Sequence, residues 1–529
     1  MKPIEALVLM FCAVIGVVMV GRRLKVPYPI ALVLGGLCIS LIPGLPTIQI
    51  NPELVFLVFL PPLLFAAAWF TSWPDFKANL RPIFLLAVGL VLFTTLVTGA
   101  VVHALIPAIP LAVAFAFGAI VSPPDAVAAT AIAKQVRLPK RIVTVLEGES
   151  LVNDATGLVA LQFALAAAVS GSFSFGQATV HFIWVATGGL ALGLLVGVLA
   201  TQLLRLIKDD SLVITVSLLV PYLAYLPAER LHLSGVLAAV AAGIYGSWNG
   251  SELLSASARI SASAVWSLLI FVFNCVLFIL IGIELPVALE ALKDYSLGHL
   301  IAYGAIASAV VILIRPVWVF PAIWLPRLWS GRSGPRDLFS SWRPVVIVAW
   351  SGMRGVVSLA AALALPMSLG DKQDFPGREL LVFLTFCVIL STLVFQGLSL
   401  PFIIRWLGVT ADASEHEERG ARLRITHAAL ARLHRLAEQP QVNEKAIQRL
   451  TGIYEQRVTH MSAPVGATPD WSRDLERWRA TRELWLEALD AQRKELAQLR
   501  REHRIDEELV HTIQRELDLE ESYLRSWAL

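Results

Sequence analysis

A group of polar residues interrupts an apolar part of the chain at residues 148–154, which read Gly-Glu-Ser-Leu-Val-Asn-Asp. In a helix, Glu149 lies four residues before Asn153 and Ser150 lies four before Asp154, so the four side chains share one face. Carboxylate, hydroxyl and amide oxygens are hard ligands that suit a hard cation such as Na⁺. The pattern therefore predicts an ion site on one helix face, with a patch of interhelical hydrogen bonds as the alternative.

A second unusual segment is Ser-Pro-Pro-Asp at residues 122–125. Two consecutive prolines remove two backbone donors and clash with the preceding turn, so we expect a helix to break here. Inside a membrane, a broken helix is tolerated only where its ends line a cavity. Asp125 would then stand at the start of the second half-helix, whose positive dipole end favours a carboxylate. The alternative is a simple proline kink.

Two arginines also lie within apolar stretches, Arg315 at residues 310–316 and Arg354 between Gly352 and Gly355. A charged side chain inside a membrane span costs at least about 2.5–3.5 kcal/mol on insertion scales, which makes it a functional candidate. Arg315 needs an acidic partner, which these residues alone do not identify. The glycines beside Arg354 weaken a helix and allow close backbone approach, and they predict a second interrupted helix.

The composition indicates which elements hold these residues. Of the 529 residues, 57% are hydrophobic and 16% are charged, and the mean hydropathy is +0.69. Soluble domains are typically about 45–50% apolar and about 25% charged. Here the last 119 residues hold 41 of the charges and the first 410 hold 42. We expect an integral membrane domain at residues 1–408 and a helical soluble domain at residues 409–529. The net charge of +3 does not indicate a nucleic-acid partner.

A helix needs roughly 20 apolar residues to cross a bilayer core about 30 Å thick. Thirteen stretches approach or exceed this length, which predicts an all-α polytopic membrane protein. They cover residues 4–21, 28–43, 52–70, 82–106, 109–134, 142–170, 178–206, 211–227, 232–248, 260–285, 297–326, 343–368 and 379–406.

The loops between these stretches differ in basic residues. The odd-numbered loops hold 16 Lys and Arg, whereas the N-terminus and the even-numbered loops hold 5. Cytoplasmic loops carry the excess of positive charge. We therefore expect the N-terminus outside and, after thirteen spans, the C-terminus in the cytoplasm.

The two predicted helix breaks lie in the fifth and the twelfth stretch. If stretches 1–6 and 8–13 form two repeats, both breaks fall in the fifth helix of their repeat. Paired interruptions at matching positions are typical of inverted-repeat transporters with a site between the broken helices. The odd offset of seven stretches gives the two repeats opposite orientations.

The soluble end of the chain is predicted to be helical. Ser414 and Glu417 have the spacing of a capping box, and apolar residues then recur at helical spacing. Pro440 ends that helix, residues 463–469 are typical of a linker, and one or two further helices begin near Trp471.

Three motifs together resemble one family. Ser-Pro-Pro-Asp-Ala-Val at 122–127, Gly-Glu-Ser-Leu-Val-Asn-Asp at 148–154 and Gly-Met-Arg-Gly at 352–355 are similar to motifs of the bacterial monovalent cation/proton antiporters of the NhaP type, relatives of the animal sodium/proton exchangers. The second motif is highly specific, and the other two support it. The resemblance covers residues 1–408, and the remainder shows no assignable motif.

The resemblance implies thirteen spans in two inverted six-helix repeats, with a dimer domain and a mobile core in which two broken helices cross. It therefore implies a homodimer in the bacterial inner membrane. Asp154 would carry the cation or the proton, and Asp125 and Ser150 would help to bind Na⁺. The Asn153-Asp154 pair implies electroneutral exchange.

The resemblance also implies roles for the remaining charges. Glu149 would pair with Arg315, and Arg354 would lie at the helix crossing and offset carbonyl dipoles. Many relatives have Thr-Asp-Pro where this chain has Pro124-Asp125-Ala126. Residue 124 therefore offers only its backbone carbonyl, which leaves the cation preference open.

The residues themselves support one mechanism. A carboxylate held away from water binds a proton more readily, and Asp154 can hold one H⁺ or one Na⁺ but not both. Competition combined with alternating access gives Na⁺/H⁺ exchange without a cofactor. K⁺/H⁺ exchange is an alternative that no motif separates. A tail-gated cation channel would need a continuous pore, and an intramembrane aspartyl protease would need a Gly-x-Gly-Asp motif that the chain lacks.

Overall fold

The computed structural model describes most of the chain. The described residues are 3–42, 55–136, 138–171, 175–253, 255–290, 292–293, 295–330, 341–369, 373–409, 412–437, 444–462, 484–496, 498, 513 and 516–521. The chain divides into two compact units, Met1–Ala411 and Asp412–Leu529, and each is described by itself.

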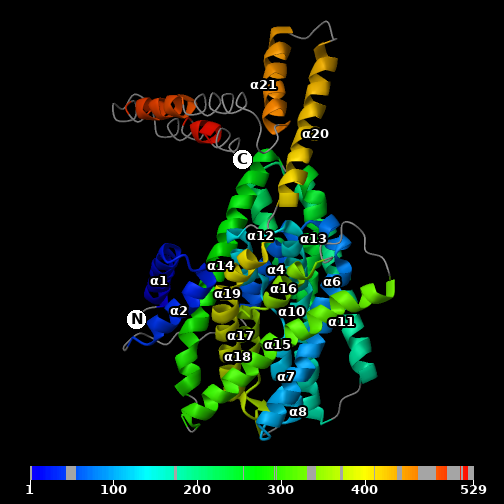
Figure 1. Cartoon of the computed structure of the whole chain (residues 1–529), viewed down its shortest axis with the longest axis vertical. Coiled ribbons are helices and arrows are strands. Elements are labelled where there is room, and N and C mark those ends of the chain that lie inside the picture. Colours follow the sequence, from blue (N-terminus) through cyan, green and yellow to red (C-terminus); the bar gives the residue numbers. More distant parts are fainter. Residues whose placement is uncertain are drawn as a thin grey trace. The chain divides into compact units, whose positions relative to one another are not determined.

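The first unit is a bundle of helices (Figure 1). Its first half contains α1 (Pro3–Arg23), α2 (Tyr28–Ser40), η1 (Val55–Phe59), α4 (Leu60–Phe70), α5 (Trp73–Ala78), α6 (Leu80–Phe84), η2 (Leu85–Leu90), α7 (Val91–Leu105), α8 (Leu111–Val121), α9 (Ala126–Gln135) and α10 (Lys140–Ser170). Its second half contains α11 (Phe175–Leu206), α12 (Asp210–Arg230), α13 (Gly235–Leu253), α14 (Ala256–Glu290), α15 (Leu297–Ser330), α16 (Trp342–Trp350), α17 (Val356–Leu363), α18 (Arg378–Ser391), η4 (Thr392–Gln396) and α19 (Gly397–Leu407).

Each of the thirteen predicted stretches coincides with one helix or with consecutive helices. Among the described residues, eight helices are long and apolar enough to cross a membrane, and two shorter apolar helices cover Tyr28–Ser40 and Phe56–Phe70. The prediction of an all-helical polytopic membrane protein is confirmed. The count of thirteen spans stays a prediction.

Both predicted helix interruptions are present. Residues 122–125 separate α8 from α9, and residues 351–355 separate α16 from α17. The only strands within the described ranges are β1 (Ser368–Leu369) and β2 (Gln373–Asp374), which pair antiparallel beyond α17.

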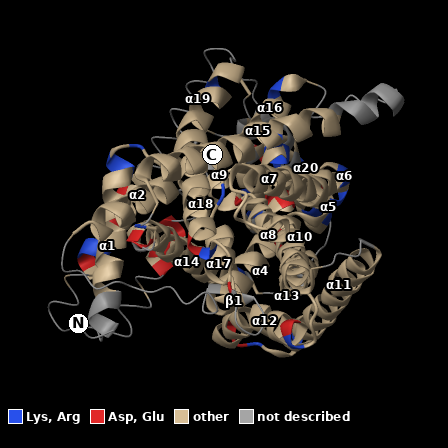
Figure 2. Cartoon of the chain, turned by 90° about the horizontal axis from the view of Figure 1, so that it is seen from below, with Lys and Arg blue, Asp and Glu red and all other residues tan. Residues whose placement is uncertain are grey.

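The interrupted helices lie in the most buried part of the first unit. One large apolar cluster joins buried residues of α8, α9, α10, α15, α16, α17 and α18. Large apolar side chains are exposed instead along the outer faces of α1, α11, α12 and α15. Figure 2 shows that most of the helical ribbon carries neither basic nor acidic residues. Apolar surface on this scale is expected of a protein that faces lipid.

Small residues let the helices approach closely. A Cβ at Gly118 of α8 would overlap the backbone of Thr95 on α7. In the same way, a Cβ at Gly36 of α2 would overlap the carbonyl of Ile279 on α14, and one at Gly282 would overlap the carbonyl of Val33. These contacts bring the helix backbones together without an intervening side chain.

The second unit contains α20 (Asp412–Ala437) and α21 (Glu444–Ser462) and a smaller helical part, in which Leu489, Leu496 and Leu517 form an apolar cluster. Arg493 donates to Asp518 at 2.5 Å beside this cluster. The prediction that Ser414 caps the start of a helix is wrong, because α20 begins two residues earlier, at Asp412. The predicted linker at 463–469 and the helix start near Trp471 lie outside the described residues.

We expect Gly118→Ala to lower the melting temperature of the purified protein, because the added methyl group would push α8 away from the Thr95 backbone. Overpacking of this kind typically costs about 1–3 kcal/mol. Gly16→Ala is the matched control, since a Cβ at Gly16 meets no atom within 4 Å. Thermal unfolding in detergent compares the two variants, and equal melting temperatures would contradict the close α7–α8 packing.

Candidate functional site

The two helix breaks face each other. Asp125 caps the start of α9, where its Oδ1 accepts a hydrogen bond from the Val127 backbone N–H at 2.7 Å. Its own backbone N–H donates to the Met353 carbonyl in the other break at 2.7 Å. A Cβ at Gly355 would overlap the Asp125 carboxylate, so glycine is required for this approach. The predicted pair of interrupted helices therefore forms one contiguous site.

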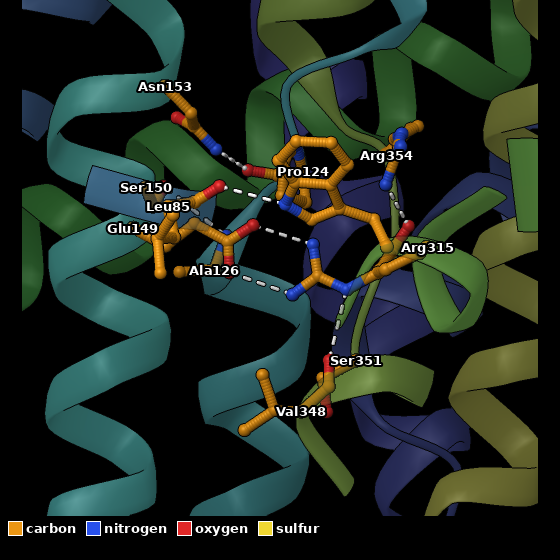
Figure 3. Close-up of polar contacts among 12 residues, drawn as sticks. Leu85, Pro124, Ala126, Glu149, Ser150, Asn153, Arg315, Val348, Ser351 and Arg354 are labelled. Atoms are coloured by element: carbon orange, nitrogen blue, oxygen red, sulfur yellow. Dashed lines mark hydrogen bonds and ion pairs between the residues drawn. The ribbon is translucent and has the colours of Figure 1, made fainter. Parts of the chain in front are cut away.

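Helix α10 presents its polar face to the first break (Figure 3). The Asn153 side-chain amide donates to the Pro124 carbonyl at 2.8 Å, while its Oδ1 has no partner among the described residues. Ser150 Oγ lies 3.5 Å from the Ala126 backbone N–H, at the limit of hydrogen bonding. These contacts bring uncharged oxygens of α10 and backbone groups of residues 124–126 together.

Asp154 lies beside this arrangement on the same helix. It is 6% exposed, and within the described part of the chain it accepts no hydrogen bond and joins no ion pair. Asp125 is near enough for the two carboxylates to interact electrostatically. A buried carboxylate without a donor is free to take a proton or a cation.

Glu149 and Arg315 form a buried ion pair, with exposures of 1% and 0%. Arg315 Nη1 and Nη2 donate to the two carboxylate oxygens at 2.6 and 2.7 Å, and Nε donates to the Val348 carbonyl of α16 at 3.0 Å. The pairing that the resemblance implied is present. Each oxygen of Glu149 accepts a hydrogen bond from the guanidinium, and the role of Glu149 as an ion ligand stays a prediction.

Arg354 binds the backbone ends of both broken helices. Its Nε donates to the Val121 carbonyl at the end of α8 at 2.7 Å, and its Nη1 donates to the Gly352 carbonyl. Its backbone N–H donates to Thr392 Oγ1 in the π-helical η4 at 3.0 Å. A cation at the carboxyl end of a helix offsets the partial negative charge of its free carbonyls. Thr392 was not found from the sequence, since hydroxyl residues such as Ser391 and Thr392 in an apolar run carry no positional signal.

A cavity of about 770 Å³ reaches α10 at Ala155, the residue after Asp154. It lies between α10 and α17 on one side and α11, α12 and α13 on the other, and polar residues line part of it, among them Gln162, His181, Glu229 and His232. From α10 the cavity is lined by residues that follow Asp154, between Ala155 and Leu165.

All seven residues singled out from the sequence thus lie in one region of the membrane unit. Two helix breaks in contact, an acid that is buried and unpaired within the described residues, and two buried arginines define a polytopic ion transporter.

Comparison with known proteins identifies the family. Residues 7–406 match the family described as "Sodium/hydrogen exchanger, transmembrane". An uncharacterised Na⁺/H⁺ exchanger of Mycobacterium tuberculosis is 35% identical over 522 residues, which are 98% of this chain and 95% of that protein. One of Escherichia coli is 34% identical over 94% of this chain and 95% of its own length.

A solved structure is also similar in fold. The sodium proton antiporter MjNhaP1 of Methanocaldococcus jannaschii superimposes with a TM-score of 0.61 at 21% identity, over 77% of this chain and 99% of that one. The chain belongs to the sodium/hydrogen exchanger family. It is a multi-pass membrane protein that exchanges monovalent cations for protons, and it is a transporter, not an enzyme.

We expect Glu149→Ala and Arg315→Ala each to lower the stability of the purified protein by about 3–5 kcal/mol, the usual effect of leaving one partner of a buried ion pair unpaired. The double variant should lose less than the sum of the two single losses, because neither charge then stays buried alone. Thermal unfolding in detergent measures all three, with the exposed Glu379→Ala as control. Strict additivity would mean that the two residues do not stabilise each other.

Proposed function

We propose that the protein is an electroneutral Na⁺/H⁺ antiporter that exchanges one Na⁺ for one H⁺ at Asp154. The observation that carries the proposal is the state of the two acids on the polar face of α10, Glu149 and Asp154. Glu149 is neutralised by Arg315, whereas Asp154 is buried and unpaired within the described residues. Of these two acids, Asp154 is therefore the one that is free to exchange its ligand.

The exchange follows from competition for one carboxylate. Asp154 with a proton is neutral, and Asp154 with Na⁺ forms a neutral pair, so both loaded forms carry the same charge. A one-for-one exchange then moves no net charge across the membrane. The membrane potential, which contributes about 2.3 kcal/mol per charge per 100 mV, does not bias such a reaction.

Further oxygen ligands for Na⁺ come from the surrounding break. Asp125 supplies a second carboxylate, and Asn153 supplies an Oδ1 that has no donor among the described residues. Ser150 supplies a hydroxyl on the same face. The Pro124 carbonyl accepts from the Asn153 amide, so it offers only its second lone pair. Hard neutral and anionic oxygens of this kind suit an alkali cation.

The arginines have supporting roles in this proposal. Arg354 offsets the carbonyl dipoles at the crossing, and Arg315 neutralises Glu149. Their positive charges stay fixed by backbone and carboxylate partners, so they do not compete for the cation site. The two broken helices belong to two inverted six-helix repeats, which give thirteen spans together with the seventh span that joins them.

The proposed setting is the bacterial inner membrane. The protein is a homodimer with its N-terminus outside and the soluble unit, residues 409–529, in the cytoplasm. In this orientation the loop after α12, which borders the 770 Å³ cavity, lies outside. The described conformation is then open toward the extracellular side.

Exchange of K⁺ is the second candidate. A relative from Bacillus subtilis, named as a sodium, potassium, lithium and rubidium/H⁺ antiporter, is 36% identical over 392 residues, which are 72% of this chain and 58% of that protein. Without a side-chain hydroxyl at position 124, the site offers fewer fixed ligands to the smaller cation. A tail-gated channel is not favoured, because a single acidic cluster balanced by arginine indicates an exchange site and not a continuous pore.

We expect Asp154→Asn to abolish cation-driven proton flux in proteoliposomes while the protein stays folded, because a neutral amide cannot take up and release a proton in exchange for the cation. Flux with Na⁺, Li⁺ and K⁺ is measured side by side, and Asp374→Asn, an exposed acid, serves as control. Continued flux through a folded Asp154→Asn protein would overturn the carrier assignment. Flux driven by K⁺ alone in the wild type would change only the cation.

We also expect truncation after Thr410 to leave basal exchange intact, since every proposed ligand precedes that residue. The truncated protein is reconstituted and its flux is compared with that of the full chain across a pH range. A modest shift in pH dependence is compatible with a regulatory tail. Complete loss of exchange by a folded truncated protein would place the soluble unit in the transport machinery.

A further inference from the structure

Glu284, on α14, is a second buried acid that the proposed exchange does not use. It is 8% exposed, its Oε2 is enclosed, and within the described residues it has no hydrogen-bond or ion-pair partner. No sequence pattern singles out Glu284, because it stands at the end of the apolar stretch 260–285, where an acid often reaches the membrane surface.

Its position on α14 is given by its neighbours along the helix. Leu277, two turns earlier, packs in a cluster with Ala360 of α17 and with Phe56 and Phe59 of η1. Residues seven apart share a helix face, so Glu284 lies on the same side of α14 as Leu277. The opposite side, at Gly282, contacts α2. Glu284 therefore stands on the face of α14 that forms a seam with α17 at Leu277.

No charged group in the described structure interacts with this carboxyl. Helices α2, α4, α17 and the segment η1 contain no Lys, Arg, Asp or Glu. On α18, Arg378 is occupied by the carbonyls of Leu363 and Leu365, at 2.9 and 3.0 Å. The other charged residues of α14 and its contacting helices stand near helix ends: Glu5, Arg22, Arg23, Asp210, Glu229, Arg230, Arg259, Glu290 and Glu379.

A proton is the ligand that suits the Glu284 carboxyl in these surroundings. An ionised carboxylate without a partner is strongly unfavourable in apolar surroundings. An alkali cation would need several further oxygen ligands, whereas the same face of α14 carries Leu277, Ile281 and Ala288. A proton needs no further ligand and makes the group neutral.

We propose that Glu284 is a second proton-binding carboxyl of this protein, which keeps its proton while α14 packs against α17 and releases it when that seam opens to water. The proton then stabilises the packed conformation, and rising pH favours the open one. Because α17 begins at the break beside Arg354, this site would link pH to the position of a broken helix. Protonation of Glu284 does not depend on exchange at Asp154, and only the transport experiment rests on the proposed function.

Infrared spectroscopy tests the protonation directly. The wild type in detergent at neutral pH should show the carbonyl-stretch band of a buried protonated carboxylic acid, and Glu284→Gln should lose that band. Glu290→Gln, which changes the exposed last residue of the same helix, should keep it. An unchanged band in Glu284→Gln would overturn the proposal, whether or not the protein transports Na⁺.

Cation/proton exchange measured at a series of pH values tests whether Glu284 releases its proton. Glu284→Gln cannot ionise, so its exchange should persist to higher pH than that of the wild type, while Glu290→Gln follows the wild type. The series uses whichever cation the wild type transports, so an error in the cation does not affect it. A pH profile identical to the wild type would overturn the proposed release. If Glu284→Gln does not fold, Glu284→Met, which is neutral and of similar length, gives the same two readouts.

Discussion

The ion pair between Glu149 and Arg315 supports the rest of the membrane site. One guanidinium binds both carboxylate oxygens on α10 and the Val348 carbonyl on α16, so a single side chain of α15 joins the polar helix to a broken one. A charge buried to this extent is stable only when its donors are satisfied. The geometry of the pair therefore restricts how these three helices can be arranged.

The need to satisfy buried polar groups also explains why the two helix breaks lie together. Two interrupted helices leave backbone groups that lipid cannot satisfy. Arg354 satisfies carbonyls from both breaks, the Asp125 backbone N–H is satisfied by Met353, and Asn153 satisfies Pro124. The two breaks and α10 thus satisfy one another's backbone groups, and Asn153 Oδ1 is left without a partner among the described residues.

The acids of the membrane unit differ in the partners that they have. Glu149 is neutralised by an arginine, Asp125 receives a backbone donor at a helix start, and Asp154 and Glu284 have neither within the described residues. In a medium of low dielectric constant, partners decide whether a carboxyl is ionised. Four acids of similar intrinsic chemistry can therefore serve structure, ligand binding and proton binding in one fold.

The sequence by itself determined the class, the helical stretches and the two breaks, because hydrophobic length and consecutive prolines or glycines act locally on the backbone. It also selected Ser150, Asn153 and Asp154, since spacing along one helix sets a common face, and Asp125, since it follows the two prolines of a break. Only the tertiary structure decided that Glu149 is taken by Arg315, that Thr392 holds the Arg354 backbone, and that Glu284 has no partner. Those outcomes depend on contacts between helices far apart in the chain, and no local pattern encodes which side chains meet there.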